Sequence, residues 1–134
     1  MADERAFELN IITPDRVFYR GEVNMVEFNT TEGEVGIYKN HIPMTFLLKP
    51  GILTIHESEE IKEAALHEGF VEVLGDKVTI MAEVIEWPDE IDQERAQAAM
   101  DRAKERIVQK DSATDIARAE TALARAVARI QVII

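Results

Sequence analysis

Residues 94–107, ERAQAAMDRAKERI, are repeated 23 positions later by residues 117–130, ARAETALARAVARI. Arginine, alanine and isoleucine occupy matching positions in the two segments. The three arginines of each segment have the spacing i, i+7, i+11, which places them within about 40° of arc on one side of an α-helix. They are Arg95, Arg102 and Arg106 in the first segment and Arg118, Arg125 and Arg129 in the second. Two similar alanine-rich helices, each with an arginine stripe, predict a hairpin that can hold an anion or present cations to a partner.

The hairpin is predicted to begin at Trp87-Pro88. Proline disfavours helical geometry in the residue before it and suits the first turn of a helix after it. The acids Asp89, Glu90 and Asp92 follow, and negative charge is favourable at a helix N-terminus. The first helix is therefore expected to start directly after this boundary and to run to about Gln109.

A short turn at Lys110-Asp111 should join the two helices. Ser112 with Asp115 resembles a capping pair that opens the second helix, which continues towards Val132. A connection of so few residues predicts that the helices are antiparallel neighbours.

Residues 1–86 have the pattern of short strands. Phe7, Leu9 and Ile11 alternate with polar residues, as in a half-buried strand. Lys49-Pro50-Gly51 and Gly75-Asp76-Lys77 are turn signals. The other strand-like segments are residues 17–19, 23–28, 35–38, 52–56, 61–66, 70–74 and 78–81, with Gly21 separating the first two. The predicted fold class is α+β: an antiparallel β-sandwich over residues 1–86, then an antiparallel two-helix hairpin over residues 87–134.

The charge distribution limits the partners. The net charge of −11 belongs almost wholly to residues 1–88, which contain 7 Lys and Arg and 17 Asp and Glu. Residues 89–134 contain 8 Lys and Arg and 9 Asp and Glu, so their net charge is close to zero. Such acidity argues against nucleic acid or anionic lipid as a partner. No apolar run approaches the roughly 20 residues that span a bilayer, so direct membrane insertion is not expected.

Nothing in the sequence indicates catalysis or a resident metal. There is no cysteine, and the three histidines, His41, His56 and His67, are scattered through the strand-rich part. No glycine-rich phosphate loop, nucleophile elbow or paired-acid motif is present. We therefore predict a protein that is not an enzyme, with no catalytic or metal-binding residue. Trp87 is expected to pack the entry of the hairpin against the sandwich.

The arginine stripes have two interpretations. On periodicity alone, the commoner interpretation is that each stripe is a solvated helix face with i, i+4 ion pairs. Against it, only Asp115 and Glu120 accompany the three arginines of the second helix. The planar guanidinium suits phosphate, so an anion site or an acidic partner stays open.

The whole chain resembles the epsilon subunit of the bacterial F-type ATP synthase. Its sharpest match is the segment Ile91-Asp92-Gln93-Glu94-Arg95-Ala96, which is similar to the I/L-D-x-x-R-A motif for ATP in the nucleotide-binding members of that family. The segments of the strand-rich part that carry the resemblance are Ile12-Thr13-Pro14, Gly21-Glu22-Val23, residues 32–36, His41-Ile42-Pro43, residues 69–73 and Val78-Thr79-Ile80. Tyr38-Lys39-Asn40 departs from the Pro-Gly type of sequence that usually precedes the family's histidine.

The resemblance implies a subunit of the central stalk, peripheral to the cytoplasmic face of the bacterial cell membrane. The sandwich would bind the gamma subunit and the ring of c subunits. The hairpin would permit ATP hydrolysis when folded on the sandwich and inhibit it when extended into the alpha/beta head. No cofactor is required; ATP would be a regulatory ligand that holds the hairpin folded. The alternative is a coupling and inhibitory subunit with no physiological ATP binding.

The resemblance also assigns roles by motif position. Ile91, Asp92 and Ala96 would surround the adenine, with Glu86 nearby. The phosphates would be bound by Arg95, Arg102, Arg125 and Arg129. Arg118 is assigned to the same ATP-binding set.

Overall fold

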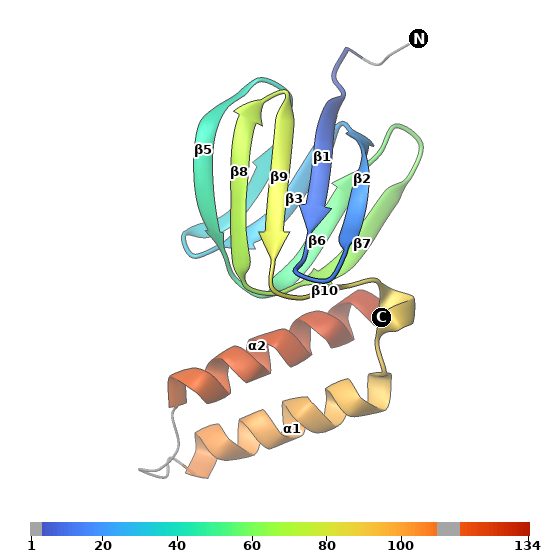
Figure 1. Ribbon diagram of the computed structural model, residues 1–134. Coiled ribbons are helices and arrows are strands. Elements are labelled where there is room, and N and C mark those ends of the chain that lie inside the picture. Colours follow the sequence, from blue (N-terminus) through green and yellow to red (C-terminus); the bar gives the residue numbers. More distant parts are fainter. Residues whose placement is uncertain (1–3, 110–115) are drawn as a thin grey trace.

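The computed structural model describes residues 4–109 and 116–134, in which two layers of strands are followed by two long helices (Figure 1). The predicted fold class, a β-sandwich followed by an antiparallel helical hairpin, is confirmed. The predicted turn at Lys110-Asp111 and the predicted capping pair of Ser112 and Asp115 lie outside the described residues.

In this part of the chain the strands are β1 (Phe7–Ile12), β2 (Val17–Val23), β3 (Met25–Thr30), β4 (Gly33–Ile37), β5 (His41–Leu48), β6 (Gly51–His56), β7 (Ile61–Leu66), β8 (Gly69–Gly75), β9 (Lys77–Ala82) and β10 (Ile85–Glu86). They form one hydrogen-bonded path in the order β10-β7-β6-β3-β5-β8-β9-β1-β2, and β4 pairs with β3 beside that path. Figure 1 shows the path folded into two layers, with β5, β8, β9, β1 and β2 in front of β3, β6 and β7.

One strand pair departs from the predicted antiparallel arrangement. β1 and β9 run parallel, with Leu9 opposite Val78 and Ile11 opposite Ile80. The other pairs are antiparallel. The parallel pair was not predictable from the pattern, because alternation along a strand says which face is buried and nothing about the direction of the neighbour.

The core lies between the two layers. Phe7, Leu9 and Ile11 of β1 are buried, as their alternation predicts, and Val71 and Val73 of β8 belong to the same buried cluster. The predicted hairpin at residues 75–77 is also confirmed.

Two details of the strands differ from the prediction. β2 continues through Gly21, and the break comes at Asn24, so the division predicted at Gly21 is wrong. No strand was predicted over β5, because Pro43 interrupts it and most of its side chains are exposed. The pairing of β5 with β8 shifts register between His41 and Met44, an irregularity of the kind that tolerates proline.

The linker forms a short 3-10 helix, η1 (Pro88–Glu90), and the first long helix, α1 (Gln93–Gln109), begins only after it. The predicted start of the long helix directly after Pro88 is therefore wrong, while the helix reaches the predicted Gln109, the last residue described before the gap at 110–115. Glu90 explains the break, because its carboxylate accepts the backbone N–H of Trp87 at 2.9 Å and closes the short turn.

The second long helix, α2 (Ile116–Ile133), lies between the sandwich and α1 (Figure 1). It contacts β6 and β7, whereas α1 packs mainly against α2. Among the helices of the described residues, none is long and apolar enough to cross a membrane.

Four alanines of the repeat are buried in the hairpin. Ala96 and Ala103 of α1 are buried, and so are Ala119 and Ala126, their equivalents in α2. α2 also buries Ala128, which lies about 200° around the helix from Ala126. α2 therefore buries two opposite faces, as its position between α1 and the sandwich requires. By the same spacing its arginine stripe lies between these faces, at the seam where α1 and the sandwich meet.

Candidate anion-binding site at the hairpin seam

A cavity of about 430 Å³ lies at this seam. Three separate parts of the chain form it: the end of β10, the linker with the first half of α1, and the last turns of α2. Its lining residues are Glu86, Glu90, Ile91, Asp92, Arg95, Ala96, Ala99, Arg102 and Arg129. Because Glu86 of the sandwich and Arg129 of α2 both line it, the cavity is complete only while the hairpin is docked on the sandwich.

Asp92 is the N-cap of α1. Its Oδ1 accepts the backbone N–H of Arg95 at 3.1 Å, and its backbone carbonyl accepts the N–H of Ala96 at 3.0 Å. One carboxylate oxygen thus satisfies a donor at the start of the helix, which fixes the side chain at the rim of the cavity.

Arg95 and Arg102 supply positive charge to the cavity from α1. Both line it, and neither forms an ion pair with any residue that the structure describes. Their spacing of seven residues keeps them on the same side of the helix, about two turns apart. Two arginines without acidic partners in one cavity can donate paired hydrogen bonds to a phosphate or carboxylate.

Arg129 reaches the cavity from α2 and is already paired. Its Nε donates to Glu86 Oε1 at 2.7 Å, and Nε2 of the buried His67 lies 3.1 Å from the same oxygen. The hydrogen bond from His67 lowers the pKa of Glu86, partial burial raises it, and Arg129 lowers it further, to about 2 in total. Glu86 is therefore a carboxylate at neutral pH, and it binds α2 to the last strand.

Arg125, one turn before Arg129, is held outside the cavity by Glu68. Its Nε lies 2.8 Å and 3.1 Å from the two carboxylate oxygens of Glu68, between β7 and β8. Burial raises the pKa of Glu68, but the hydrogen bonds from Arg125 and from its own backbone give a net lowering. Glu68 is thus a carboxylate at neutral pH.

Gly69 fixes the backbone beside Glu68. Its φ is +156°, and a Cβ at this position would lie 2.1 Å from the carbonyl oxygen of Met81. Only glycine permits this approach of β8 to β9, so the position of Glu68 is set by the sheet.

The linker is anchored to β2. The ring of Trp87 stacks on Phe18 with a centroid separation of 4.2 Å, and Trp87 packs against the core, which confirms the predicted role of this residue. Arg16 pairs with Glu90 at 2.9 Å, and this hydrogen bond, together with the one from the Trp87 backbone, lowers the pKa of Glu90. The wall of the cavity formed by the linker therefore stays with the sandwich.

Most of the predicted site residues come together in this cavity: Glu86, Ile91, Asp92, Arg95, Ala96, Arg102 and Arg129. Arg125 does not line it, and neither does Arg118, which lies in the first turn of α2 at the far end of the hairpin. Glu90 and Ala99 line the cavity and were not predicted. The sequence contains an indication of each, because Ala99 belongs to the repeated alanines and Glu90 directly precedes the Ile91-Asp92 motif.

The three histidines have separate partners. His41 Nδ1 lies 2.7 Å from the carbonyl oxygen of Ile42, His56 pairs with Glu27 at 2.8 Å, and His67 contacts Glu86.

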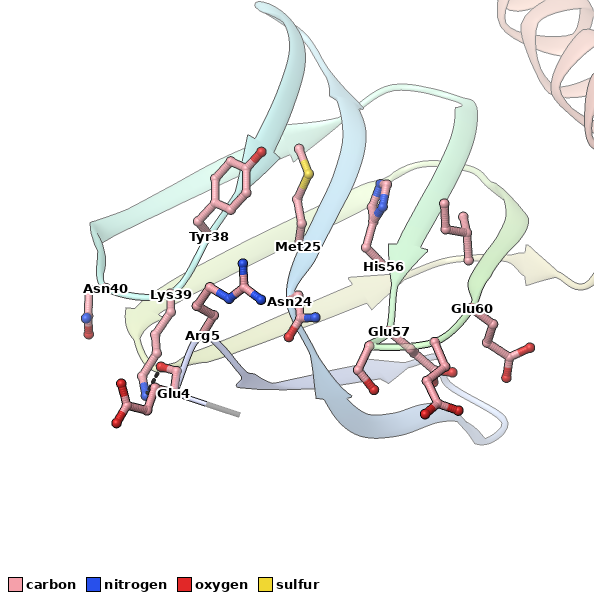
Figure 2. Close-up of a pocket in the computed structure, with 13 residues that line it drawn as sticks. Glu4, Arg5, Asn24, Met25, Tyr38, Lys39, Asn40, His56, Glu57 and Glu60 are labelled. Carbon is pink, nitrogen blue, oxygen red and sulfur yellow. Dashed lines mark hydrogen bonds between the residues drawn. The ribbon is translucent and has the colours of Figure 1, made fainter. Parts of the chain in front are cut away.

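A larger cavity, of about 830 Å³, lies at the opposite end of the sandwich, near the first described residues and the loop after β6 (Figure 2). Lys39 donates to the backbone carbonyl of Glu4 there at 3.0 Å. Besides His56, the lining of this cavity contains four acidic residues, Glu4, Glu57, Glu59 and Glu60, and two basic ones, Arg5 and Lys39. The excess of carboxylates makes this cavity unfavourable for a phosphate.

The fold and the site together define a sandwich-and-hairpin module with an arginine-lined cavity at the joint between its parts. Two family models match the chain in the same order. The β-sandwich domain of the ATP synthase delta/epsilon chain matches residues 6–88, and the long α-helix domain matches residues 89–133.

Bacterial proteins named ATP synthase epsilon chain are similar along nearly the whole length. The chain is 44% identical to that of Caldanaerobacter subterraneus subsp. tengcongensis over 130 residues, which cover 96% of this chain and 94% of the relative. It is 43% identical to that of Halalkalibacterium halodurans over 125 residues, with coverages of 92% and 94%. A chain in the solved structure of the Euglena gracilis mitochondrial ATP synthase, OSCP/F1/c-ring, has the same fold, with a TM-score of 0.80 at 24% identity over 92% of this chain and 79% of that one. The chain therefore belongs to the ATP synthase delta/epsilon chain family, as an epsilon-type, non-catalytic subunit of an F-type ATP synthase.

Proposed function

We propose that the chain works in the central stalk of the ATP synthase, peripheral to the cytoplasmic face of the bacterial membrane. The sandwich binds the gamma subunit and the ring of c subunits. The hairpin restrains ATP hydrolysis when it extends into the alpha/beta head, and ATP bound at the seam holds it folded.

The observation that carries this proposal is the cavity at the seam. A ligand that contacts both Asp92, at the linker end of α1, and Arg129 of α2 binds only while α2 stays packed between α1 and the sandwich, because extension of the hairpin would separate these residues. A ligand with higher affinity for one of two arrangements shifts the equilibrium towards that arrangement. ATP would therefore oppose extension.

The lining supports a nucleotide in chemical terms. The volume lies in the usual range of ligand pockets, about 300–1,000 Å³. The guanidinium groups of Arg95 and Arg102 suit phosphates. In this proposal Ile91 and Ala96 contact the adenine ring, and the carboxylate of Asp92 accepts a hydrogen bond from the adenine amino group. Guanine carries an oxo group there, which cannot donate.

The outer face of the sandwich supports a protein partner. Five apolar residues form a row across neighbouring strands of the front layer: Leu47 pairs with Phe70, Phe70 with Met81, Met81 with Ile12, and Ile12 with Val17. Leu47 is 64% exposed and Val17 is 60% exposed. An apolar row of this length on an outer face is typical of an interaction surface, and we assign it to the gamma subunit. Phe70→Glu should weaken co-purification with gamma while the sandwich stays folded.

The alternative is a coupling and inhibitory subunit that does not bind ATP physiologically. The ion pairs Arg125–Glu68 and Arg129–Glu86 favour it, because they already dock α2 without a nucleotide. The two functions differ in whether ATP is needed to hold the hairpin.

Isothermal titration of the whole chain with ATP tests the proposal. We expect saturable binding that Arg95→Ala weakens by about tenfold to a hundredfold, since a hydrogen bond to a charged group contributes roughly 1.5–3 kcal/mol. Arg106→Ala is the matched control, because Arg106 lies on the same stripe and does not line the cavity. Absence of heat at millimolar ATP would leave only the coupling and inhibitory function.

A further inference from the structure

We infer that Glu68 is an internal competitor of the nucleotide phosphates for Arg125. In the docked hairpin its carboxylate holds Nε of Arg125 and keeps this side chain outside the cavity, and this lowers the affinity of the seam for ATP. The inference rests on the proposed function, and it assigns to that site an affinity-setting residue outside its lining.

The position of Arg125 on α2 is the first observation. Arg125 lies four residues before Arg129, so the two side chains leave the same side of the helix about one turn apart. Arg129 lines the cavity, but Arg125 does not, although both belong to the same stripe. The difference between them is the partner: Glu68 lies outside the cavity and holds Arg125 by both carboxylate oxygens, at 2.8 Å and 3.1 Å from Nε.

The placement of Glu68 is the second observation. Gly69, the residue after Glu68, lies close against β9. The backbone carbonyl of Glu68 accepts the N–H of Glu83 at 2.8 Å. The sandwich thus presents the carboxylate from a fixed backbone. Since Glu68 does not line the cavity, its replacement removes no atom that a bound nucleotide would contact.

Competition follows from the chemistry of the guanidinium. Carboxylate and phosphate oxygens accept hydrogen bonds from the same N–H donors. The contact with Glu68 engages Nε and keeps the side chain of Arg125 outside the cavity, so ATP can draw Arg125 towards its phosphates only by weakening this pair, and the free energy of that change is subtracted from the binding free energy. The side chains are partly exposed, 45% for Arg125 and 30% for Glu68, so the pair is of modest strength. We expect Glu68→Gln to tighten ATP binding by about twofold to tenfold.

The pair of Arg125 and Glu68 also docks α2 on the sandwich. Two measurements therefore distinguish competition for Arg125 from a purely structural role of Glu68. Without ATP, Glu68→Gln should increase hydrogen exchange of the α2 amides, because one docking contact is lost. With ATP, a structural role predicts weaker binding, whereas competition predicts tighter binding. The two measurements must therefore move in opposite directions.

The experiment is calorimetric titration of ATP into the whole chain as wild type, Glu68→Gln, Glu83→Gln, Arg125→Ala and Glu68→Gln/Arg125→Ala. Glu83 is the matched control, since it is an exposed neighbouring acid without an ion pair among the described residues. The expected result is tighter binding by Glu68→Gln only, with no gain when Arg125 is absent.

Three outcomes contradict the inference. If the wild type binds ATP and Glu68→Gln binds with equal or lower affinity, the competition does not exist and the proposed function stands. If the gain persists without Arg125, Glu68 acts through another residue. If neither the wild type nor Glu68→Gln binds ATP, the proposed nucleotide site and the inference both fail.

Discussion

Arg129 on the last helix and Glu86 at the end of the last strand form an ion pair of 2.7 Å between Nε and Oε1. The contact joins residues 43 positions apart in the sequence, and it connects the hairpin to the sandwich at the rim of the cavity. Whatever releases the hairpin must break this pair.

Replacing Arg129 should therefore loosen the hairpin. Among the described residues, Arg129→Ala leaves His67 as the side-chain partner of Glu86, and we expect the free energy of local opening of α2 to fall by about 1 kcal/mol. Hydrogen exchange of the α2 amides without ligand measures this. Arg106→Ala should leave the exchange unchanged; an equal effect of both changes would mean that helix propensity, and not the ion pair, is being measured.

Docking should weaken in acid because of Glu86. The pKa of Glu86 in the folded chain is about 2, below its ordinary 4.5, so its stabilising contribution is present above about pH 4.5 and is lost as the pH falls towards 2. Urea unfolding of the wild type and Glu86→Gln between pH 2 and pH 7 tests this. The difference in the free energy of unfolding between them should be largest near neutral pH and shrink below pH 4.5. A difference that is constant with pH would show that the carboxylate charge does not matter.

The strand-rich part should fold without the hairpin, and its end should depend on Trp87. A chain ending at Glu90 retains the stack of Trp87 on Phe18 and the pair of Glu90 with Arg16, whereas a chain ending at Glu86 loses both. We expect β-type circular dichroism from each. The longer fragment should be more stable by about 1–3 kcal/mol, because an aromatic pair and its buried area are retained. Equal stability, or an unfolded longer fragment, would contradict the role assigned to the linker.

The buried alanines should not tolerate larger residues. Ala126 is fully buried on a helix with a neighbour on each side, so Ala126→Leu should open the hairpin at a cost of about 1–3 kcal/mol. Protease cleavage of the hairpin measures this while the sandwich stays intact. Ala98→Leu, on an exposed position of α1, is the matched control and should have little effect.

The local patterns of the sequence predicted most of the fold. Alternation in β1 and the turn at residues 75–77 gave the strands, and the arginine and alanine repeat gave the two helices. The parallel pairing of β1 with β9 and the strand β5 were missed, because the first is a non-local relation and the second has no clean alternation. The predicted start of α1 is too early because the acids after Pro88 satisfy a helix N-terminus and a short 3-10 turn equally well.

The site was predictable to a similar extent. The motif at Ile91-Asp92 and the stripe positions of Arg95 and Arg102 identified the part of the cavity formed by α1. The partners of the α2 arginines were not found, because Glu68 lies 57 residues from Arg125 and no local spacing relates them. Ion pairs between distant segments depend on how the hairpin docks, and this becomes visible only in three dimensions.

Hydrogen exchange of the whole chain with and without millimolar ATP reports nucleotide binding and hairpin closure in one measurement. If a nucleotide at the seam holds the hairpin folded, the α1 and α2 amides should gain protection with ATP. GTP should protect much less, and Asp92→Ala should reduce the protection given by ATP. Identical exchange of the hairpin with and without saturating ATP would contradict the claim that a nucleotide at the seam holds the hairpin folded.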